Sequence, residues 1–223
     1  MASAPRSTTV RRTIRVDHLA RVEGHGMFKV VLRDGKVTQS EFALIEAPRF
    51  FEALLRGRHF TDAPDITARI CGICPVAYQV SSCQAMEQAL GVTLDEPLRE
   101  LRRLLYCGEW IESHALHVYL LHAPDYLGYD DAIGLARDHP EVVQKGLALK
   151  KAGNAIVATL GGREIHPINV RVGGFYRAPE LRELQALVPD LETALQIARE
   201  TVALVAGFEC PTLEHDYELV ALR

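Results

Sequence analysis

Residues 69–78 have the sequence Arg-Ile-Cys-Gly-Ile-Cys-Pro-Val-Ala-Tyr, and this stretch gives the strongest indication of what the chain does. Cys71 and Cys74 are separated by two residues, a spacing that lets both sulfurs reach one metal ion. Pro75 suits the first turn of a helix, because its φ is fixed near helical values and its missing N–H would lack a partner there. The helix N-terminus and the neighbouring Arg69 both favour thiolate over thiol. The stretch therefore predicts a metal clip, a redox dithiol or two small packed side chains at the start of a helix.

The composition is that of an ordinary globular protein. The chain has 223 residues, of which 48% are hydrophobic and 24% charged, and its net charge is −4. This balance supplies enough apolar surface for a sizeable core and gives no indication of a nucleic acid or an anionic membrane as partner. No apolar run approaches the roughly 18 residues of a membrane span. Residues 1–12 are polar and lack the apolar core of a secretory signal, so we expect a disordered arm and a cytoplasmic protein.

The hydrophobic pattern predicts an α+β fold that is mainly helical. Short apolar runs between residues 13 and 45, with a hairpin turn at Asp34-Gly35, indicate an antiparallel β-layer. A bundle of long helices follows, and strands and helices do not alternate as a parallel sheet requires. The length allows one large domain or two small ones. The predicted helices cover residues 48–57, 75–90, 94–122, 140–160 and 178–206, the last broken near Pro189, and a strand is expected from Asp216.

The cysteine pair by itself leaves several functions open. A structural zinc site would need a second Cys or His pair, and Cys83 and Cys107 are too isolated to supply it. A thioredoxin-like dithiol would need a βαβ setting, which the pattern lacks. Five cysteines are an odd and scattered set, which argues against a disulfide framework. A small zinc or dithiol protein therefore stays as one alternative.

Two further groups of polar residues stand out. His114 and His117 are three residues apart on one predicted helix face, where a polar stripe that is hydrogen-bonded to a neighbouring helix is favoured over direct metal binding. Asp125 follows Pro124 at the end of that helix, as an exposed cap would. His166 lies in a loop after two glycines, which is typical either of a tight loop held close to a site or of an ordinary turn.

Taken together, five segments resemble the N-terminal half of a [NiFe]-hydrogenase large subunit, most closely its cytoplasmic, carrier-linked group. They occur in the order of that family and at suitable separations. The resemblance implies that residues 13–223 are the N-terminal half of a single large-subunit domain. Each segment alone is a modest match, whereas five in series are specific. The segments are Arg21-Val22-Glu23-Gly24-His25, Pro48–Glu52 with Gly57-Arg58, Arg69–Cys74, Ser113–His117 through Pro124-Asp125, and Gly162-Arg163 with His166-Pro167 and Gly173-Gly174.

This resemblance implies reversible heterolytic oxidation of H2 at a nickel ion bridged to an iron that carries cyanide and carbonyl ligands. Cys71 would be a terminal nickel ligand, and Cys74 would bridge nickel and iron, since soft thiolates suit both metals. Glu23 matches a carboxylate that transfers protons, a role that burial would support by holding its pKa near the working pH. Glu52 matches a carboxylate ligand of a buried magnesium ion.

The resemblance also implies a set of outer residues around this centre. Asp125 would lie over the bimetallic centre, while His114, His117 and His166 would orient ligands or the structure around them. Tyr78 stands where the family often has a histidine that donates a hydrogen bond to the bridging sulfur. A phenol can also donate to sulfur, so this hydrogen bond could persist with different proton chemistry.

The resemblance further implies partner subunits and a second cysteine pair that this chain lacks. The chain would form a hetero-oligomer with a small iron–sulfur subunit and with carrier-reducing, diaphorase-type subunits. The family's second cysteine pair, in a DPCxxC motif, is absent, and Cys210 is not a substitute for it. We therefore expect a chain truncated before that pair and inactive alone. The alternative is a non-catalytic scaffold related to the quinone-site subunit of respiratory complexes, although that relative lacks the cysteine pair.

Overall fold

The computed structural model describes residues 10–44 and 48–221. The chain divides into two compact units, Met1–His59 and Phe60–Arg223, and each is considered by itself. Most of the predicted N-terminal arm, residues 1–9, lies outside the described residues, and the first strand begins already at Arg11. The predicted α+β class with a mainly helical content is confirmed.

The first unit contains a three-stranded antiparallel sheet in the order β1-β2-β3. Asp34 and Gly35 have positive φ angles of 50° and 77°, as expected for the tight turn of a hairpin. The predicted hairpin is therefore confirmed. The predicted helix after the sheet is also found, and Gly57, with φ of 74°, follows its end. The elements are β1 Arg11–Val16, β2 Gly26–Arg33, β3 Lys36–Leu44 and α1 Pro48–Leu55.

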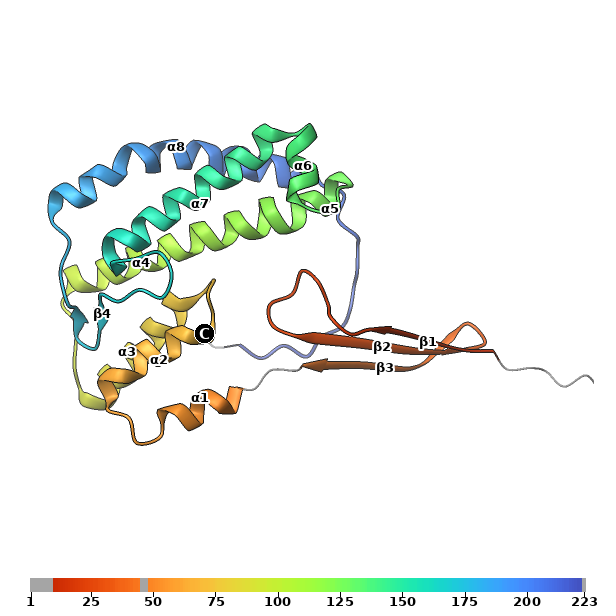
Figure 1. Ribbon diagram of the computed structural model, residues 1–223, viewed down its shortest axis with the longest axis horizontal. Helices are drawn as coiled ribbons and strands as arrows, with labels where there is room; N and C mark the ends of the chain where they lie inside the picture. The colour runs from red at the N-terminus through yellow and green to blue at the C-terminus, as the bar shows by residue number, and fades with distance from the viewer. Residues whose placement is uncertain (1–9, 45–47, 222–223) are drawn as a thin grey trace, which may run out of the picture. The chain divides into compact units, whose positions relative to one another are not determined.

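The second unit is a helical assembly in which α4, α7 and α8 are the long members (Figure 1). Residues from α3, α4 and α7, together with Val170 of β4, form its main apolar core. A second cluster joins α4 and α7 to α8 through Leu149 and Ala194. The elements are the 3-10 turns η1 Phe60–Asp62 and η2 Ala68–Ile70, the π-helical segment η3 Leu116–His122, and the helices and strands α2 Ala63–Thr67, α3 Pro75–Leu90, α4 Glu96–Ala115, α5 Ala123–Leu127, α6 Ala132–Asp138, α7 Pro140–Gly161, β4 Val170–Arg171, β5 Gly174–Phe175 and α8 Leu181–Ala206.

The backbones of α4 and α7 approach closely at Gly153. A Cβ atom at this position would lie 2.6 Å from the backbone nitrogen of Glu112 and 2.6 Å from the carbonyl oxygen of Gly108. Only glycine allows two helix backbones to come this near. The contact fixes the middle of α4 against α7, and this is the part of α4 that faces the start of α3.

The predicted helix over residues 94–122 differs from the structure in its last seven residues, which form a π-helix in place of a regular α-helix. Regular α-helix ends at Ala115, and the chain continues as a wide π-helical turn in which the N–H of Ala123 donates to the carbonyl of Val118. The reason is Pro124, which cannot donate to the carbonyl of Leu120 and whose ring would clash with it in a regular helix. The widened turn accommodates the proline, which then opens α5.

Helix α8 is more continuous than predicted, because it runs through Pro189 without a break. Leu187 and Leu191, on either side of the proline, both pack on the main core. This burial offsets the roughly 3 kcal/mol that an interior proline costs a helix.

The strand predicted from Asp216 is also wrong. Residues 209–221 have no regular secondary structure, and Leu219 and Val220 are almost fully exposed. A strand is stabilised by pairing with a neighbour, and none is present in the described part of the chain. None of the described helices combines the length and apolar character that a membrane span requires.

Candidate metal centre

The loop that carries the two cysteines is organised around the sulfur of Cys71. Cys71 follows η2 in an extended conformation and is 7% exposed, while Cys74 is half-buried and precedes the first residue of α3. The backbone N–H groups of Ile73 and Cys74 donate to Cys71 Sγ over 3.3 and 3.2 Å. Two donors directed at one sulfur suit the electron-rich thiolate, the form in which cysteine binds metals.

A buried carboxylate from another helix caps α3. Glu109 of α4 accepts hydrogen bonds from the backbone N–H of Val76 (2.6 Å, Oε2) and of Ala77 (3.0 Å, Oε1). Pro75 has no N–H to satisfy, and the side chain of Cys74 makes no capping hydrogen bond. The carboxylate therefore takes the place of the usual N-cap side chain, and its charge is favourable at this end of the helix.

Glu109 has a second buried carboxylate beside it. Glu112 lies one turn further along α4, and the two residues are 3% and 7% exposed. Burial raises the pKa of Glu109 to about 7, partly opposed by its two backbone hydrogen bonds. Burial also raises the pKa of Glu112 to about 7, against the opposing effect of Lys150, whose Nζ lies 3.8 Å from its carboxylate.

These two carboxyl groups predict a characteristic pH dependence of stability. Between the ordinary pKa near 4.5 and the folded value near 7, the folded protein holds protons that the unfolded chain has released. The free energy of unfolding should therefore fall as pH rises through this window, by about 3 kcal/mol per group, and level off above it. Chemical denaturation between pH 4.5 and 8 measures this slope. Glu109→Gln and Glu112→Gln should each flatten it, whereas an unchanged slope in both variants would contradict the assignment.

The predicted loop around His166 does lie against the cysteine stretch. His166 Nδ1 is 2.8 Å from the carbonyl oxygen of Ala68, which can only accept, so this ring nitrogen carries the proton. Ala68 lies three residues before Cys71. The buried side chain of Gln79, on α3, donates to the carbonyl of Pro167 over 2.8 Å. The loop thus holds both η2 and α3 in place, and the tight-loop alternative fits better than an ordinary turn.

Tyr78 lies one helical turn after Cys74 on α3. Tyr78 is 37% exposed, and its carbonyl accepts a hydrogen bond from the hydroxyl of Thr67 over 3.4 Å. Cys74 precedes α3 with a non-helical backbone (φ −122°, ψ 40°), so the spacing of four residues does not by itself place the phenol beside its sulfur.

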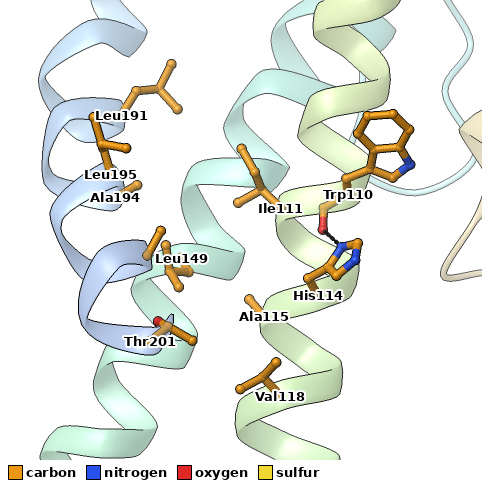
Figure 2. Close-up of a pocket in the computed structure, with 11 residues that line it drawn as sticks. Trp110, Ile111, His114, Ala115, Val118, Leu149, Leu191, Ala194, Leu195 and Thr201 are labelled. Carbon is orange, nitrogen blue, oxygen red and sulfur yellow. Dashed lines mark hydrogen bonds between the residues drawn. The ribbon is translucent and has the colours of Figure 1, made fainter. Parts of the chain in front are cut away.

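The histidines of the long helix interact within their own segment. His114 Nδ1 lies 2.6 Å from the carbonyl oxygen of Trp110 and donates to it (Figure 2). The ring of His117 lies 4.3 Å from that of His122, between ring centroids, and burial together with these neighbouring rings lowers its pKa. The predicted stripe was expected to contact a neighbouring helix, whereas the acceptor for His114 lies on its own helix and the ring contact of His117 lies within η3.

Asp125 lies in the first turn of α5, where its side chain is partly exposed and His122 Nδ1 is 3.9 Å from its carboxylate. Its predicted place above the bimetallic centre stays a prediction.

Glu23 and Glu52 belong to the first unit. Glu23 lies between β1 and β2, Glu52 lies on α1, and both are exposed there. The positions of the two units relative to one another are not determined, so no distance joins these carboxylates to the cysteines.

The donor set fits half of a soft-metal site. Cys71 and Cys74 offer two thiolates at the start of a helix, the ligand type that nickel and iron centres with sulfur ligands use. Among residues 10–44 and 48–221, no three His, Cys, Asp or Glu side chains come close enough to hold an ion. Further ligands are therefore needed to complete a cage.

A separate apolar groove of about 490 Å³ runs between α4, α7 and α8 (Figure 2). Its walls include Ile111, Leu149 and Leu195, with His114 at one side. It contains no cysteine, so it is distinct from the candidate metal centre.

Glu109 and Glu112 were not predicted from the sequence. The available signal was two carboxylates three residues apart on an amphipathic helix, close to the buried Leu105 and Ala115. This spacing indicates that both point into the protein interior. It does not indicate which helix end they meet.

Comparison with known proteins identifies the family. Residues 49–145 match the family described as nickel-dependent hydrogenase. The chain is 45% identical over 196 residues to the alpha subunit of sulfhydrogenase 2 from Pyrococcus furiosus, a match that covers 88% of this chain and 48% of the relative. It is 39% identical over 196 residues to the alpha subunit of sulfhydrogenase 1 from the same organism, and this match covers 88% of this chain and 46% of that relative.

Solved structures agree with the sequence comparison. The structure of an NAD+-reducing [NiFe]-hydrogenase in the H2-reduced state matches with a TM-score of 0.82 and 32% identity, over 87% of this chain and 45% of that one. A Ni-Fe-Se hydrogenase from D. vulgaris Hildenborough matches with a TM-score of 0.75 and 29% identity, over 88% and 44%. The chain thus spans about half the length of the relatives it matches. The predicted resemblance is confirmed, and the chain belongs to the nickel-dependent hydrogenase large-subunit family.

Proposed function

We propose that this chain supplies half of the catalytic nickel–iron site of a [NiFe]-hydrogenase large subunit. The observation that carries the proposal is the Cys71–Cys74 pair at the start of α3, inside the segment that matches the family. The reaction is the reversible conversion of H2 into two protons and two electrons.

The two thiolates would hold the metals in different ways. Cys71, whose sulfur already accepts two backbone hydrogen bonds, would be a terminal ligand of nickel. Cys74 would bridge nickel and an iron that carries cyanide and carbonyl ligands. Such a centre, when bound, supplies an open coordination position at which H2 is split.

The protein residues would move the protons and hold a second metal. Glu23 would carry protons between the centre and the surface, and Glu52 would be a ligand of magnesium, which prefers oxygen donors. Tyr78 would donate a hydrogen bond to the sulfur of Cys74 from one turn along α3. His166 would hold η2, which leads into Cys71, through its hydrogen bond to Ala68.

Asp125 would lie over the bimetallic centre, and His114 and His117 would orient ligands or the structure around them. The hydrogen bond of His114 and the ring contact of His117 lie within α4 and η3, so these two histidines would act through the position of those helices.

The partners follow from the same assignment. A small iron–sulfur subunit would take the electrons, and diaphorase-type subunits would pass them to a soluble carrier. The similarity to the alpha subunits of two sulfhydrogenases and to an NAD+-reducing enzyme supports this choice. We propose a cytoplasmic hetero-oligomer.

Hydrogen uptake tests this function. The complex that contains this chain, purified from its own host together with its maturation system, should reduce a redox dye when supplied with H2. The 223-residue chain alone should not, because its two thiolates do not complete a metal cage. Dye reduction by the chain alone, or a nickel-free complex that is stably assembled and inactive, would contradict the proposal. The second outcome would favour the scaffold alternative.

A further inference from the structure

The N-terminal turn of α3 has a complete set of hydrogen-bond partners, and Glu109 supplies half of it. From Ile73 to Ala77 the backbone offers four N–H donors, because proline at position 75 has none. Two donate to the sulfur of Cys71 and two to the carboxylate of Glu109. One sulfur and one carboxylate thus determine the conformation of the residues around Cys74.

Cysteine is not among the residues favoured at the position directly before a helix. This position favours Ser, Thr, Asp or Asn, whose side chains cap the first turn. The side chain of Cys74 makes no such cap, and the carboxylate of Glu109 does so from α4. Because Glu109 caps the helix, the sulfur of Cys74 is not needed as a cap.

Glu109 is itself held in place by its surroundings. Glu109 is 3% exposed and lies on the segment of α4 that Gly153 lets approach α7 closely. Its neighbour Glu112 has Lys150 of α7 at 3.8 Å, so the two buried carboxylates make different contacts. Only Glu109 reaches the backbone of α3.

We propose that Glu109 is a positioning residue for Cys74, fixing the direction of its sulfur by capping α3 from the neighbouring helix. This inference rests on the proposed function, because it concerns how a metal ligand is held. Outer partners of metal ligands typically contribute about 10- to 100-fold to metal affinity, and we expect an effect of this size from Glu109.

Three variants in the assembled complex test the proposal. Glu109→Ala removes both acceptors, and Glu109→Gln leaves one, because an amide has a single acceptor oxygen. Glu112→Gln is the matched control, since it also neutralises a buried carboxylate on α4 and leaves the cap intact. The measurements are nickel retained after dialysis against a chelator, and amide hydrogen exchange at Val76 and Ala77.

We expect Glu109→Ala to retain nickel about 10- to 100-fold less well than the wild type, with Glu109→Gln between the two. Exchange at Val76 and Ala77 should accelerate by roughly tenfold or more as the hydrogen bonds to the side chain of Glu109 are lost. Glu112→Gln should leave both measurements near their wild-type values. The graded order of the two Glu109 variants is the signature of positioning, because general destabilisation would affect Glu112→Gln equally.

Unchanged nickel retention and amide exchange in Glu109→Ala would overturn the proposal, as would equal losses in Glu109→Gln and Glu112→Gln. If Glu109→Ala does not fold, exchange at Val76 and Ala77 in Glu109→Gln decides the question. The exchange readout also separates this inference from the proposed function. A wild-type complex without nickel would contradict the function, while accelerated exchange confined to the Glu109 variants would still support the cap.

Discussion

Replacement of Cys71 or Cys74 by serine should remove nearly all nickel and all hydrogen turnover from the assembled complex. A serine hydroxyl is a hard donor that stays protonated near neutral pH, so it cannot replace a soft thiolate on nickel or iron. Nickel is measured by elemental analysis of the purified complex, and turnover by H2-dependent dye reduction. The stability of Cys74→Ser should change little by comparison, because Cys74 is only half-buried.

Cys107→Ser is the matched control for this pair. Cys107 is also half-buried and lies on α4, outside the loop that carries the candidate ligands. It should keep its nickel and its activity. Wild-type nickel in both Cys71→Ser and Cys74→Ser would show that these residues are not ligands.

Replacement of Arg102 by alanine should lower the free energy of unfolding by about 3 to 5 kcal/mol, the usual cost of leaving one member of a buried ion pair behind. The guanidinium of Arg102 donates to both oxygens of Glu87 over 2.9 and 2.7 Å, and the two side chains are 5% and 7% exposed. It also donates to the carbonyl of Arg171 (2.8 Å), while Glu87 accepts from the N–H of Gly173 (2.7 Å). The pair therefore joins α3, α4 and the loop that contains the Gly173-Gly174 element of the family.

Chemical denaturation measures this loss, with Arg103→Ala as the control at the exposed neighbouring position. Replacing both members, by Arg102→Met with Glu87→Leu, should recover much of the stability, because no unpaired charge then remains buried. A single Arg102→Ala variant within about 0.5 kcal/mol of the wild type, the range typical of surface substitutions, would contradict this account.

The sequence predicted those parts of the fold that depend on local signals. Gly91 and Gly162 end α3 and α7 with φ of 67° and 83°, as glycines after a helix do. Pro75 opens α3 at the predicted residue, and Asp34-Gly35 forms the predicted turn. In each case the residue itself determines the backbone conformation, so no distant contact is needed.

The errors arose where tertiary contacts outweigh local preference. Pro189 was expected to break α8, and packing of the helix on both sides of it prevents this. The periodicity predicted one regular helix up to His122, whereas its last seven residues form the wide turn before Pro124. The apolar residues near Asp216 suggested a strand, but the described part of the chain offers it no neighbour to pair with.

The candidate site divides in the same way. The two-residue spacing of Cys71 and Cys74 predicts a candidate metal-binding pair. The four other segments that resemble the family assign this pair its proposed role as nickel and iron ligands. Glu109 could not be found, because it meets α3 across a separation of 33 residues. Only the structure shows that the start of α3 is fixed by a sulfur on one side and a carboxylate on the other.

Metal analysis of the wild-type complex, assembled with its maturation system, tests the central claim most directly. We predict stoichiometric nickel together with iron, lost from Cys71→Ser and Cys74→Ser and retained in Cys107→Ser. A fully assembled wild-type complex that contains zinc, or no metal, at the Cys71–Cys74 pair would contradict it.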